Sequence, residues 1–342
     1  MTNSESVLIV GPSWVGDMVM AQSLLITLKQ NTQTEIDVLA PSWCHPLLAR
    51  MPEVREAVLQ PTEHGELNLS KRYSLGKNLR AKRYDKSIVI PRSLKSALVP
   101  FFAHIPRRIG YRGEMRFGLI NDMRRLDKTI LTQTVQRYVA LAQPKNLTTA
   151  PQIPSPKLTV DIENQSKLVS DLALKLDAPI IGIVPGAEYG PAKRWPANSY
   201  SQLVNELANK GHYVWVFGSQ KDYEIGAEIG TQLSPTLSDR VINLCGKTAL
   251  IDVIDLLALT RAIVCNDSGL MHIAAAVGSE IIAIYGSSTP DYTPPLTDKA
   301  QVIYKRMACS PCFKRTCPLG HTNCLKEISV QEVLSAVEVE YD

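Results

Sequence analysis

The sequence has 342 residues, of which 45% are hydrophobic and 20% charged, a composition typical of globular proteins and a length sufficient for two domains. No apolar stretch approaches the roughly 18 residues that a membrane-spanning helix needs, and the first residues show no secretory signal. Seven cysteines, an odd number without an export signal, indicate the reducing cytoplasm.

The net charge of +4 is distributed very unevenly. Residues 71–128 contain 16 Lys and Arg against 4 Asp and Glu, a net charge of +12, so the rest of the chain carries −8. Such a basic segment indicates an anionic partner, although a solvated basic face gives the same pattern. Only 6% of residues are aromatic and no nucleic-acid-binding module is recognisable, so phosphorylated small molecules or an anionic membrane surface are favoured over nucleic acid.

Short apolar runs alternate with helical patterns along the chain. Strands are predicted over residues 6–10, 35–40, 85–91, 107–112, 179–186, 212–219, 261–267 and 280–287, and helices over 17–30, 197–211, 249–260 and 269–278. Apolar strands followed by helices predict an α/β protein whose parallel sheets are covered on both faces. A proline-rich stretch, residues 144–156, divides the chain into predicted domains 1–155 and 165–325. A C-terminal helix is predicted for residues 326–342, beginning with a capping box of Ser329 and Glu332.

The first predicted strand ends in GPSWVGDM, residues 11–18. Gly11 and Gly16 have the spacing of a phosphate-binding P-loop, but Asp17 and Met18 stand where that loop carries Lys and Ser or Thr. A carboxylate here does not suit a phosphate. One interpretation is that Asp17 acts on a ligand at the strand end, and the other is that it caps a helix over 17–29.

Three further motifs follow predicted strands in the second half, where open parallel sheets bind their ligands. The loop PGAEYGPAKRWP offers Lys193 and Arg194 as cations for phosphates. Asp222 follows the strand that ends in FGS and could accept from a ribose, with Glu224 as the alternative. In CNDSGLMHIAAA, residues 265–276, a helix starts directly after a tight turn, so its N–H groups and dipole favour a diphosphate. Asp267 or Ser268 as an ordinary N-cap and His272 as a packed histidine remain the alternatives.

These motifs, in this order, resemble glycosyltransferase family 9, and the resemblance covers nearly the whole chain. It rests on VLIVGPSWVGDMVMAQSL, PGAEYGPAKRWP, FGSQKD, CNDSGLMHIAAA and CSPCFKRTCPLGHTNCL. The resemblance implies a GT-B fold, in which two facing Rossmann-like domains hold the active site in the cleft between them. It implies ADP-heptose bound by the C-terminal domain and a phosphorylated heptosyl-Kdo2-lipid A acceptor bound by the N-terminal domain. The GPSW form of the first turn favours an acceptor that already carries one heptose.

The family pattern also implies roles for individual residues. Asp17 matches the catalytic base and Lys193 the contact to the donor phosphates. The diphosphate and sugar contacts match Asp267, Ser268, Gly269 and His272, and Asp222 matches the acid near the ribose. The basic segment would hold the acceptor at the anionic cytoplasmic face of the inner membrane, with Arg107, Arg108 and Arg112 as candidates. The resemblance implies no metal or other cofactor.

Cys309, Cys312, Cys317 and Cys324 stand close together in the sequence. The CxxC pair could begin a tetrahedral zinc site, but the second pair has an unusual spacing, so a reduced structural cluster or disulfides formed after purification are alternatives. For the chain as a whole, alternatives to the implied transferase are another core heptosyltransferase, a sugar-nucleotide epimerase and a non-catalytic sugar-nucleotide-binding protein. An NAD dehydrogenase is disfavoured because no G-x-G-x-x-G follows a predicted strand.

Overall fold

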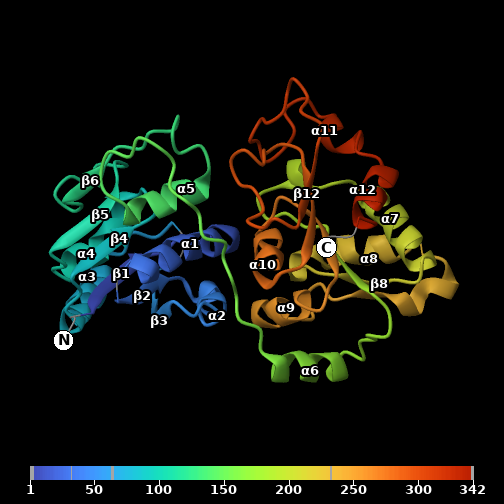
Figure 1. Ribbon diagram of the computed structural model, residues 1–342, viewed down its shortest axis with the longest axis horizontal. Helices are drawn as coiled ribbons and strands as arrows, with labels where there is room; N and C mark the ends of the chain where they lie inside the picture. The colour runs from blue at the N-terminus through green and yellow to red at the C-terminus, as the bar shows by residue number, and fades with distance from the viewer. Residues whose placement is uncertain (1–3, 32, 63–64, 232, 340–342) are drawn as a thin grey trace. The chain divides into compact units, whose positions relative to one another are not determined.

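The computed structural model describes residues 4–31, 33–62, 65–231 and 233–339 (Figure 1). The chain divides into two compact units, Met1–Pro156 and Lys157–Asp342, so the division falls one residue after the end predicted for the first domain. Residues 1–3 and 340–342, which the predicted domains and C-terminal helix include, lie outside the described residues. None of the helices in the described part of the chain has the length and hydropathy needed to cross a bilayer.

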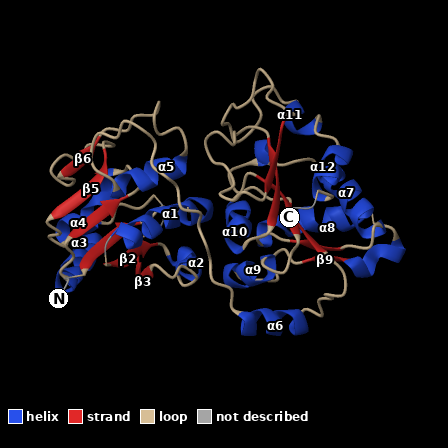
Figure 2. Cartoon of the chain, in the orientation of Figure 1, coloured by secondary structure: helices blue, strands red, loops and turns tan. Residues whose placement is uncertain are grey.

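The first unit is built on a six-stranded parallel sheet in the order β3-β2-β1-β4-β5-β6. Its strands are β1 (Glu5–Val10), β2 (Thr34–Ala40), β3 (Val54–Leu59), β4 (Lys86–Val89), β5 (Arg107–Tyr111) and β6 (Asp122–Arg124). Figure 2 shows the helices on both sides of this sheet. They are α1 (Val15–Asn31), α2 (His45–Leu48), α3 (Leu69–Leu79), α4 (Leu98–Phe102) and α5 (Thr134–Val139). Helix α1 packs beside α5, and α3 packs beside α4 over the face that carries Leu8, Val10 and Val89.

The second unit repeats this architecture with the strand order β12-β11-β10-β7-β8-β9, again all parallel. Its strands are β7 (Ile180–Val184), β8 (Tyr213–Val216), β9 (Val241–Asn243), β10 (Ala262–Asn266), β11 (Glu280–Tyr285) and β12 (Ala300–Tyr304). Its helices are α6 (Ile162–Asp171), α7 (Ala197–Asn209), α8 (Tyr223–Thr231), α9 (Leu250–Leu257), α10 (Gly269–Val277), α11 (Asn323–Lys326) and α12 (Val330–Val337). The predicted α/β class with parallel sheets in two Rossmann-like halves is thus confirmed.

The central strands explain why the fold forms. In β7 and β10 every residue is buried, as expected for parallel strands covered on both faces. On one face Ile181, Ile183 and Val264 pack against α7 and α12 through Leu203, Val333 and neighbouring side chains. The loops at the carboxyl ends of these strands carry the polar motifs predicted from the sequence, and the candidate site is built there.

The C-terminal helix is shorter than predicted. Helix α12 covers Val330–Val337, and the hydroxyl of Ser329 accepts from the N–H of Glu332 at 3.2 Å, which is one half of the predicted capping box. Residues 326–328 belong instead to the end of α11 and the turn between the helices, because Ile328 N–H donates to the Leu325 carbonyl.

Candidate active site

Asp17 lies in the first turn of α1, directly beyond the carboxyl end of β1. The helix begins at Val15, and Met18 N–H already donates to the Trp14 carbonyl at 2.9 Å, so Asp17 is not the N-cap residue and that alternative was wrong. The phenol of Tyr138, on α5, donates to Asp17 Oδ1 at 3.0 Å. The half-buried carboxylate is therefore oriented by a side chain from a second helix.

Tyr138 could not have been found from the sequence. It lies 121 residues from Asp17 in a short helical segment that carries no recognisable motif. The contact arises because α1 and α5 pack side by side, which depends on the completed sheet beneath them (Figure 1).

The three arginines predicted to bind the acceptor do not lie together. Arg107 and Arg108 begin β5, in register with the first residues of β4, so they lie at the amino ends of the strands. Asp17 follows the carboxyl end of β1, so the length of the strands separates Asp17 from Arg107 and Arg108. Arg112 comes directly after β5 and is exposed at the carboxyl edge, where Asp17 also lies.

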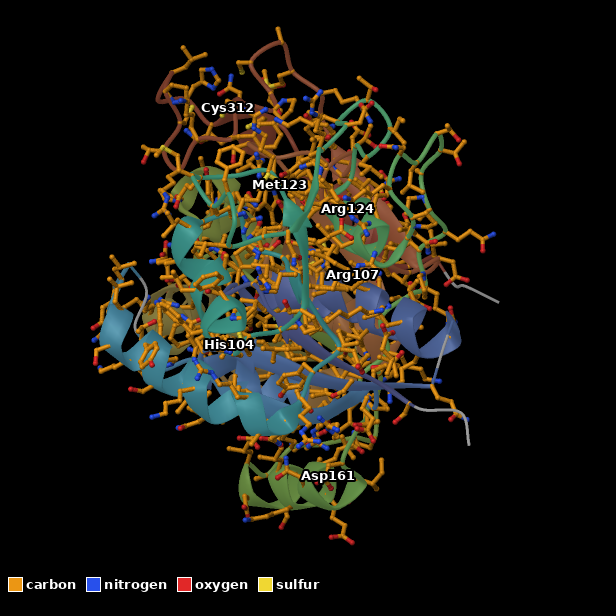
Figure 3. All side chains as sticks on the ribbon, turned by 90° about the vertical axis from the view of Figure 1, so that its left-hand side faces the viewer. His104, Arg107, Met123, Arg124, Asp161 and Cys312 are labelled. Atoms are coloured by element: carbon orange, nitrogen blue, oxygen red, sulfur yellow. The ribbon has the colours of Figure 1, made fainter. Side chains whose placement is uncertain are left out.

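The side chains of Arg107 and Arg108 are also occupied at the amino edge. Arg107 forms a 2.9 Å ion pair with Asp122, and Arg108 donates to the carbonyls of Ile105 and Leu119 at 2.5 and 2.7 Å. Arg107 and Arg124, from the amino end of β5 and the carboxyl end of β6, line a cavity of about 340 Å³, and Figure 3 shows both side chains. The structure thus places Arg107 and Arg108 at the edge opposite to Asp17 and Arg112 at the same edge as Asp17, because strand direction decides which edge a residue joins.

The second unit brings five of the predicted donor-binding residues together at the start of α10. Lys193 ends the short 3-10 helix η5 (Pro191–Lys193) after β7, and its ammonium group forms a 2.5 Å ion pair with Asp267, which follows β10. Asp267 is only 6% exposed, and the Thr293 hydroxyl also donates to it at 3.4 Å. Strands β7 and β10 are neighbours, so their carboxyl ends place this pair in front of the α10 N-terminus.

Ser268 and Gly269 form the start of α10. Ser268 occupies the N-cap position, but its hydroxyl makes no capping bond, so the ordinary capping role considered for it was wrong. Both the buried Ser268 Oγ and the buried His272 Nδ1 have no hydrogen-bond partner among the described residues. Burial lowers the pKa of His272 to about 4, which keeps the imidazole neutral near pH 7 and able to bond an uncharged ligand group. An anionic ligand here would meet the Lys193 cation, the N–H groups that begin α10, and two polar atoms, Ser268 Oγ and His272 Nδ1, that have no partner among the described residues.

Asp222 lies beyond β8, at the same edge, in the short 3-10 helix Gln220–Asp222. Its Oδ2 accepts from the backbone N–H and the hydroxyl of Ser219 at 2.9 and 2.7 Å. The carboxylate also fills the space beside Gly186 and Gly218, where an added Cβ would come within 2.4 and 2.7 Å of Asp222 atoms. Asp222 is thus fixed between the β7 and β8 loops, whereas the alternative Glu224 is exposed on α8.

The cysteine-containing segment, Cys309–Cys324, supports the loop that carries Lys193. Ala192 N–H donates to the Arg315 carbonyl at 3.0 Å, and the Tyr189 hydroxyl donates to the Phe313 carbonyl at 2.8 Å. Its thiols are all free, and burial beside the other three raises the pKa of Cys324. Within the described ranges, no group of three or more His, Cys, Asp or Glu side chains is arranged to hold a metal ion, so the zinc alternative finds no support.

Comparison with known proteins identifies the family. The family model described as glycosyltransferase family 9 (heptosyltransferase) matches residues 72–323, about three quarters of the chain. The chain belongs to glycosyltransferase family 9. Curated relatives in this family include lipopolysaccharide heptosyltransferase 2 of Salmonella typhimurium, 49% identical over 96% of both chains. Lipooligosaccharide heptosyltransferase 2 of Haemophilus influenzae is 51% identical over 87% of this chain and 88% of the relative.

Solved heptosyltransferase structures confirm the fold. The structure of E. coli ADP-heptose lps heptosyltransferase II matches with a TM-score of 0.87 and 45% identity over 97% of each chain. An E. coli heptosyltransferase solved with ADP matches with a TM-score of 0.70 and 20% identity over 97% of this chain and 99% of that chain, which supports the fold alone. As a member of family 9 the chain is a glycosyltransferase with the GT-B fold predicted from its motifs.

Proposed function

We propose that this chain transfers heptose from ADP-heptose to the first heptose of a phosphorylated heptosyl-Kdo2-lipid A acceptor, with inversion at the anomeric carbon. The observation that carries the proposal is the 49% identity to a heptosyltransferase 2 across 96% of both chains. The geometry of the residues in each unit supports the proposal. The carboxylate of Asp17 follows β1 in the first unit, and the ammonium group of Lys193 lies at the N-terminus of α10 in the second.

Asp17 would act as the general base. The acceptor hydroxyl loses its proton to the Asp17 carboxylate while its oxygen forms a bond to the anomeric carbon of the donor. The bond from that carbon to the β-phosphate oxygen breaks at the same time, and ADP leaves with the bonding electrons. Tyr138 holds the carboxylate in place at 3.0 Å. One base without a covalent intermediate gives a single displacement, hence inversion, by analogy with inverting glycosidases.

Lys193 and the N–H groups that begin α10 would stabilise the leaving diphosphate, on which negative charge develops in the transition state. His272 remains neutral beside it and keeps a nitrogen for a phosphate or sugar hydroxyl. Asp222, held beyond β8 by Ser219, would accept from the ribose hydroxyls. Lys193 and the N–H groups of α10 would carry the charge of the leaving diphosphate, and the proposed transfer takes place without a metal ion.

The acceptor carries phosphates and carboxylates and is part of an anionic membrane. The net charge of +12 between residues 71 and 128 would attract it to the first unit and hold the chain at the cytoplasmic face of that membrane. Arg112 is the candidate for direct contact, because it is exposed at the carboxyl edge of the first sheet.

Incubation with ADP-heptose and two truncated acceptors, one without heptose and one with a single heptose, tests this proposal. We expect ADP release and a mass increase of one heptose only with the acceptor that already carries heptose. Transfer only to the acceptor without heptose would assign the chain to the first addition. Tight ADP-heptose binding without transfer to either would leave a binding protein, and epimerised donor would indicate an epimerase.

A further inference from the structure

Two consecutive serines beyond β11 have buried hydroxyls without partners. Ser287 and Ser288 are 1% and 3% exposed, and neither Oγ atom has a hydrogen-bond partner among the described residues. Leaving a buried hydroxyl unpaired costs roughly 1–3 kcal/mol. The next residue, Thr289, shows the usual outcome, since its hydroxyl donates to Asp291 at 2.9 Å.

The two serines belong to the same sheet edge as the donor-binding residues. Strands β10 and β11 are neighbours in register, with Asn266 opposite Ile284, and Asp267 N–H donates to the Ile284 carbonyl at 3.3 Å. The loop after β11 therefore begins beside Asp267 and Ser268. At the same edge, Ser268 Oγ and His272 Nδ1 are also buried without a hydrogen-bond partner among the described residues.

The strand order indicates which part of the donor would lie here. Neighbouring strands run in the order β11-β10-β7-β8, with about 4.8 Å between them. The proposed ribose contact, Asp222, follows β8, and the proposed diphosphate contacts, Lys193 and Asp267, follow β7 and β10. A donor bound with its ribose at β8 and its diphosphate at β7 and β10 places its sugar over the end of the next strand, β11. This step rests on the proposed function.

The backbone of the serine loop is fixed on its other side. Phe313 N–H donates to the Ser287 carbonyl at 2.7 Å, and the hydroxyl of Ser310 bonds to the Gly286 carbonyl. A Cβ at Gly286 would lie 2.5 Å from the Leu325 side chain, so the chain is packed closely there. Each hydroxyl is thus held at a fixed Cα and can reorient only about χ1.

We propose that Ser287 and Ser288 hydrogen-bond the hydroxyl groups of the transferred sugar and so contribute to the choice of donor. A serine hydroxyl both donates and accepts, which matches a sugar hydroxyl better than it matches an anionic phosphate that only accepts. The ligand class is a polyhydroxylated sugar joined to a nucleoside diphosphate. A site built to bond such hydroxyls rejects donors that lack them, because its own buried groups then remain unpaired.

Calorimetric titration of Ser287→Ala and Ser288→Ala with ADP-heptose and with ADP tests the proposal. We expect ADP-heptose to bind about tenfold more weakly, as for the loss of one buried hydrogen bond. ADP should keep its Kd within about twofold, because it lacks the sugar. The Tm of the ligand-free variants should stay the same or rise, since an unpaired buried hydroxyl has been removed. Ser279→Ala is the matched control: Ser279 is 3% exposed like Ser288, but its hydroxyl donates to the Leu257 carbonyl at 2.8 Å, so its loss should lower the Tm.

Several outcomes would overturn this inference. Equal weakening of ADP and ADP-heptose would assign the hydroxyls to the diphosphate, and a Tm loss like that of Ser279→Ala with unchanged affinities would make them structural. If the unmodified chain transfers heptose and both Ala variants keep full ADP-heptose affinity, this inference alone fails. If the unmodified chain binds ADP but not ADP-heptose, the proposed function fails with it.

Discussion

Tyr138 on α5 donates its phenolic hydrogen to the Asp17 carboxylate on α1 at 3.0 Å. The bond joins two helices on the same face of the first sheet and fixes the direction of the one acidic side chain in the first turn of α1. A base held in this way keeps its position whether or not an acceptor is bound. Tyr138 is therefore a positioning residue for the proposed chemistry, not one that touches the reacting atoms.

Replacing Asp17 by Asn should abolish the base while keeping the contact, since an amide oxygen still accepts from Tyr138. We expect kcat to fall by roughly 10²–10⁴-fold, the usual contribution of a positioned general base. The Tm and the Kd for ADP should change little, because Asp17 does not cap α1. Kinetics with purified acceptor measure kcat, and calorimetry measures ADP binding. A near-normal kcat would show that Asp17 is not the general base.

The Lys193–Asp267 pair should serve stability and binding in separable ways. Lys193→Met leaves Asp267, 6% exposed, without its cation. We expect this to lower the free energy of unfolding by about 3 kcal/mol and to weaken ADP binding by at least about tenfold. The double variant Lys193→Met/Asp267→Asn removes both charges and should regain most of the stability but not the affinity. Restored ADP binding in the double variant would exclude Lys193 as a phosphate contact.

Arg112 and Arg107 offer a matched comparison, because both are exposed arginines of one strand region at opposite edges of the sheet. Arg112→Glu should raise the acceptor KM by about tenfold or more, and the increase should shrink at high salt. Arg107→Glu should change this KM by less than about twofold, although the loss of its ion pair with Asp122 lowers the Tm. Initial rates at two ionic strengths decide the question, and equal KM effects would contradict the assignment by sheet edge.

His272 should make stability depend on pH. Burial lowers its pKa from 6.5 to about 4, so between these values the unfolded chain holds more protons than the folded chain. Stability is therefore lost as the pH falls through this window. The decrease in the free energy of unfolding from pH 7 to pH 5 should be smaller by about 2 kcal/mol in His272→Gln, as measured by urea denaturation. His212, whose pKa burial also lowers, contributes in the same direction and remains in the variant.

The control for this measurement is His104→Asn, which removes an exposed histidine and should leave the decrease unchanged. Asparagine tolerates the left-handed backbone of this position, where φ is 56°. A decrease of the same size in His272→Gln and in the unmodified chain would show that the His272 imidazole is not desolvated.

The eight strands predicted from apolar runs are all present, and the four that were not predicted are the edges of the two sheets. These are β3 and β6 in the first sheet and β12 and β9 in the second. Edge strands have one open side, so they need no continuous apolar run. In β3 (VREAVL) only one residue is buried, and in β9 (VIN) none is. The central strands can be predicted because burial on both faces requires a continuous run of apolar residues, whereas partial burial does not.

The candidate site was predictable where it depends on a strand end followed at once by a helix. Asp267, Ser268 and Lys193 were found because a turn motif places each beyond a central strand. Tyr138 and the two serines after β11 were not found, since one depends on helix packing and the others on burial. The sheet edge at which Arg107 and Arg108 lie could not be predicted for a further reason. Charge density gives no direction along a strand, whereas their position in β5 does.

The loop that carries Lys193 is held by hydrogen bonds to residues that follow β12, the last strand. Ala192 bonds to Arg315, Tyr189 bonds to Phe313, and Trp195 Nε1 donates to the Ile328 carbonyl at 3.2 Å. A fragment of the second unit that ends with β12 would keep all six strands of its sheet and still lose the hydrogen bonds that support the Lys193 loop. A fragment meant to keep the proposed donor site intact therefore has to extend through residue 328, and a fusion or truncation designed on the sheet alone would remove part of that support.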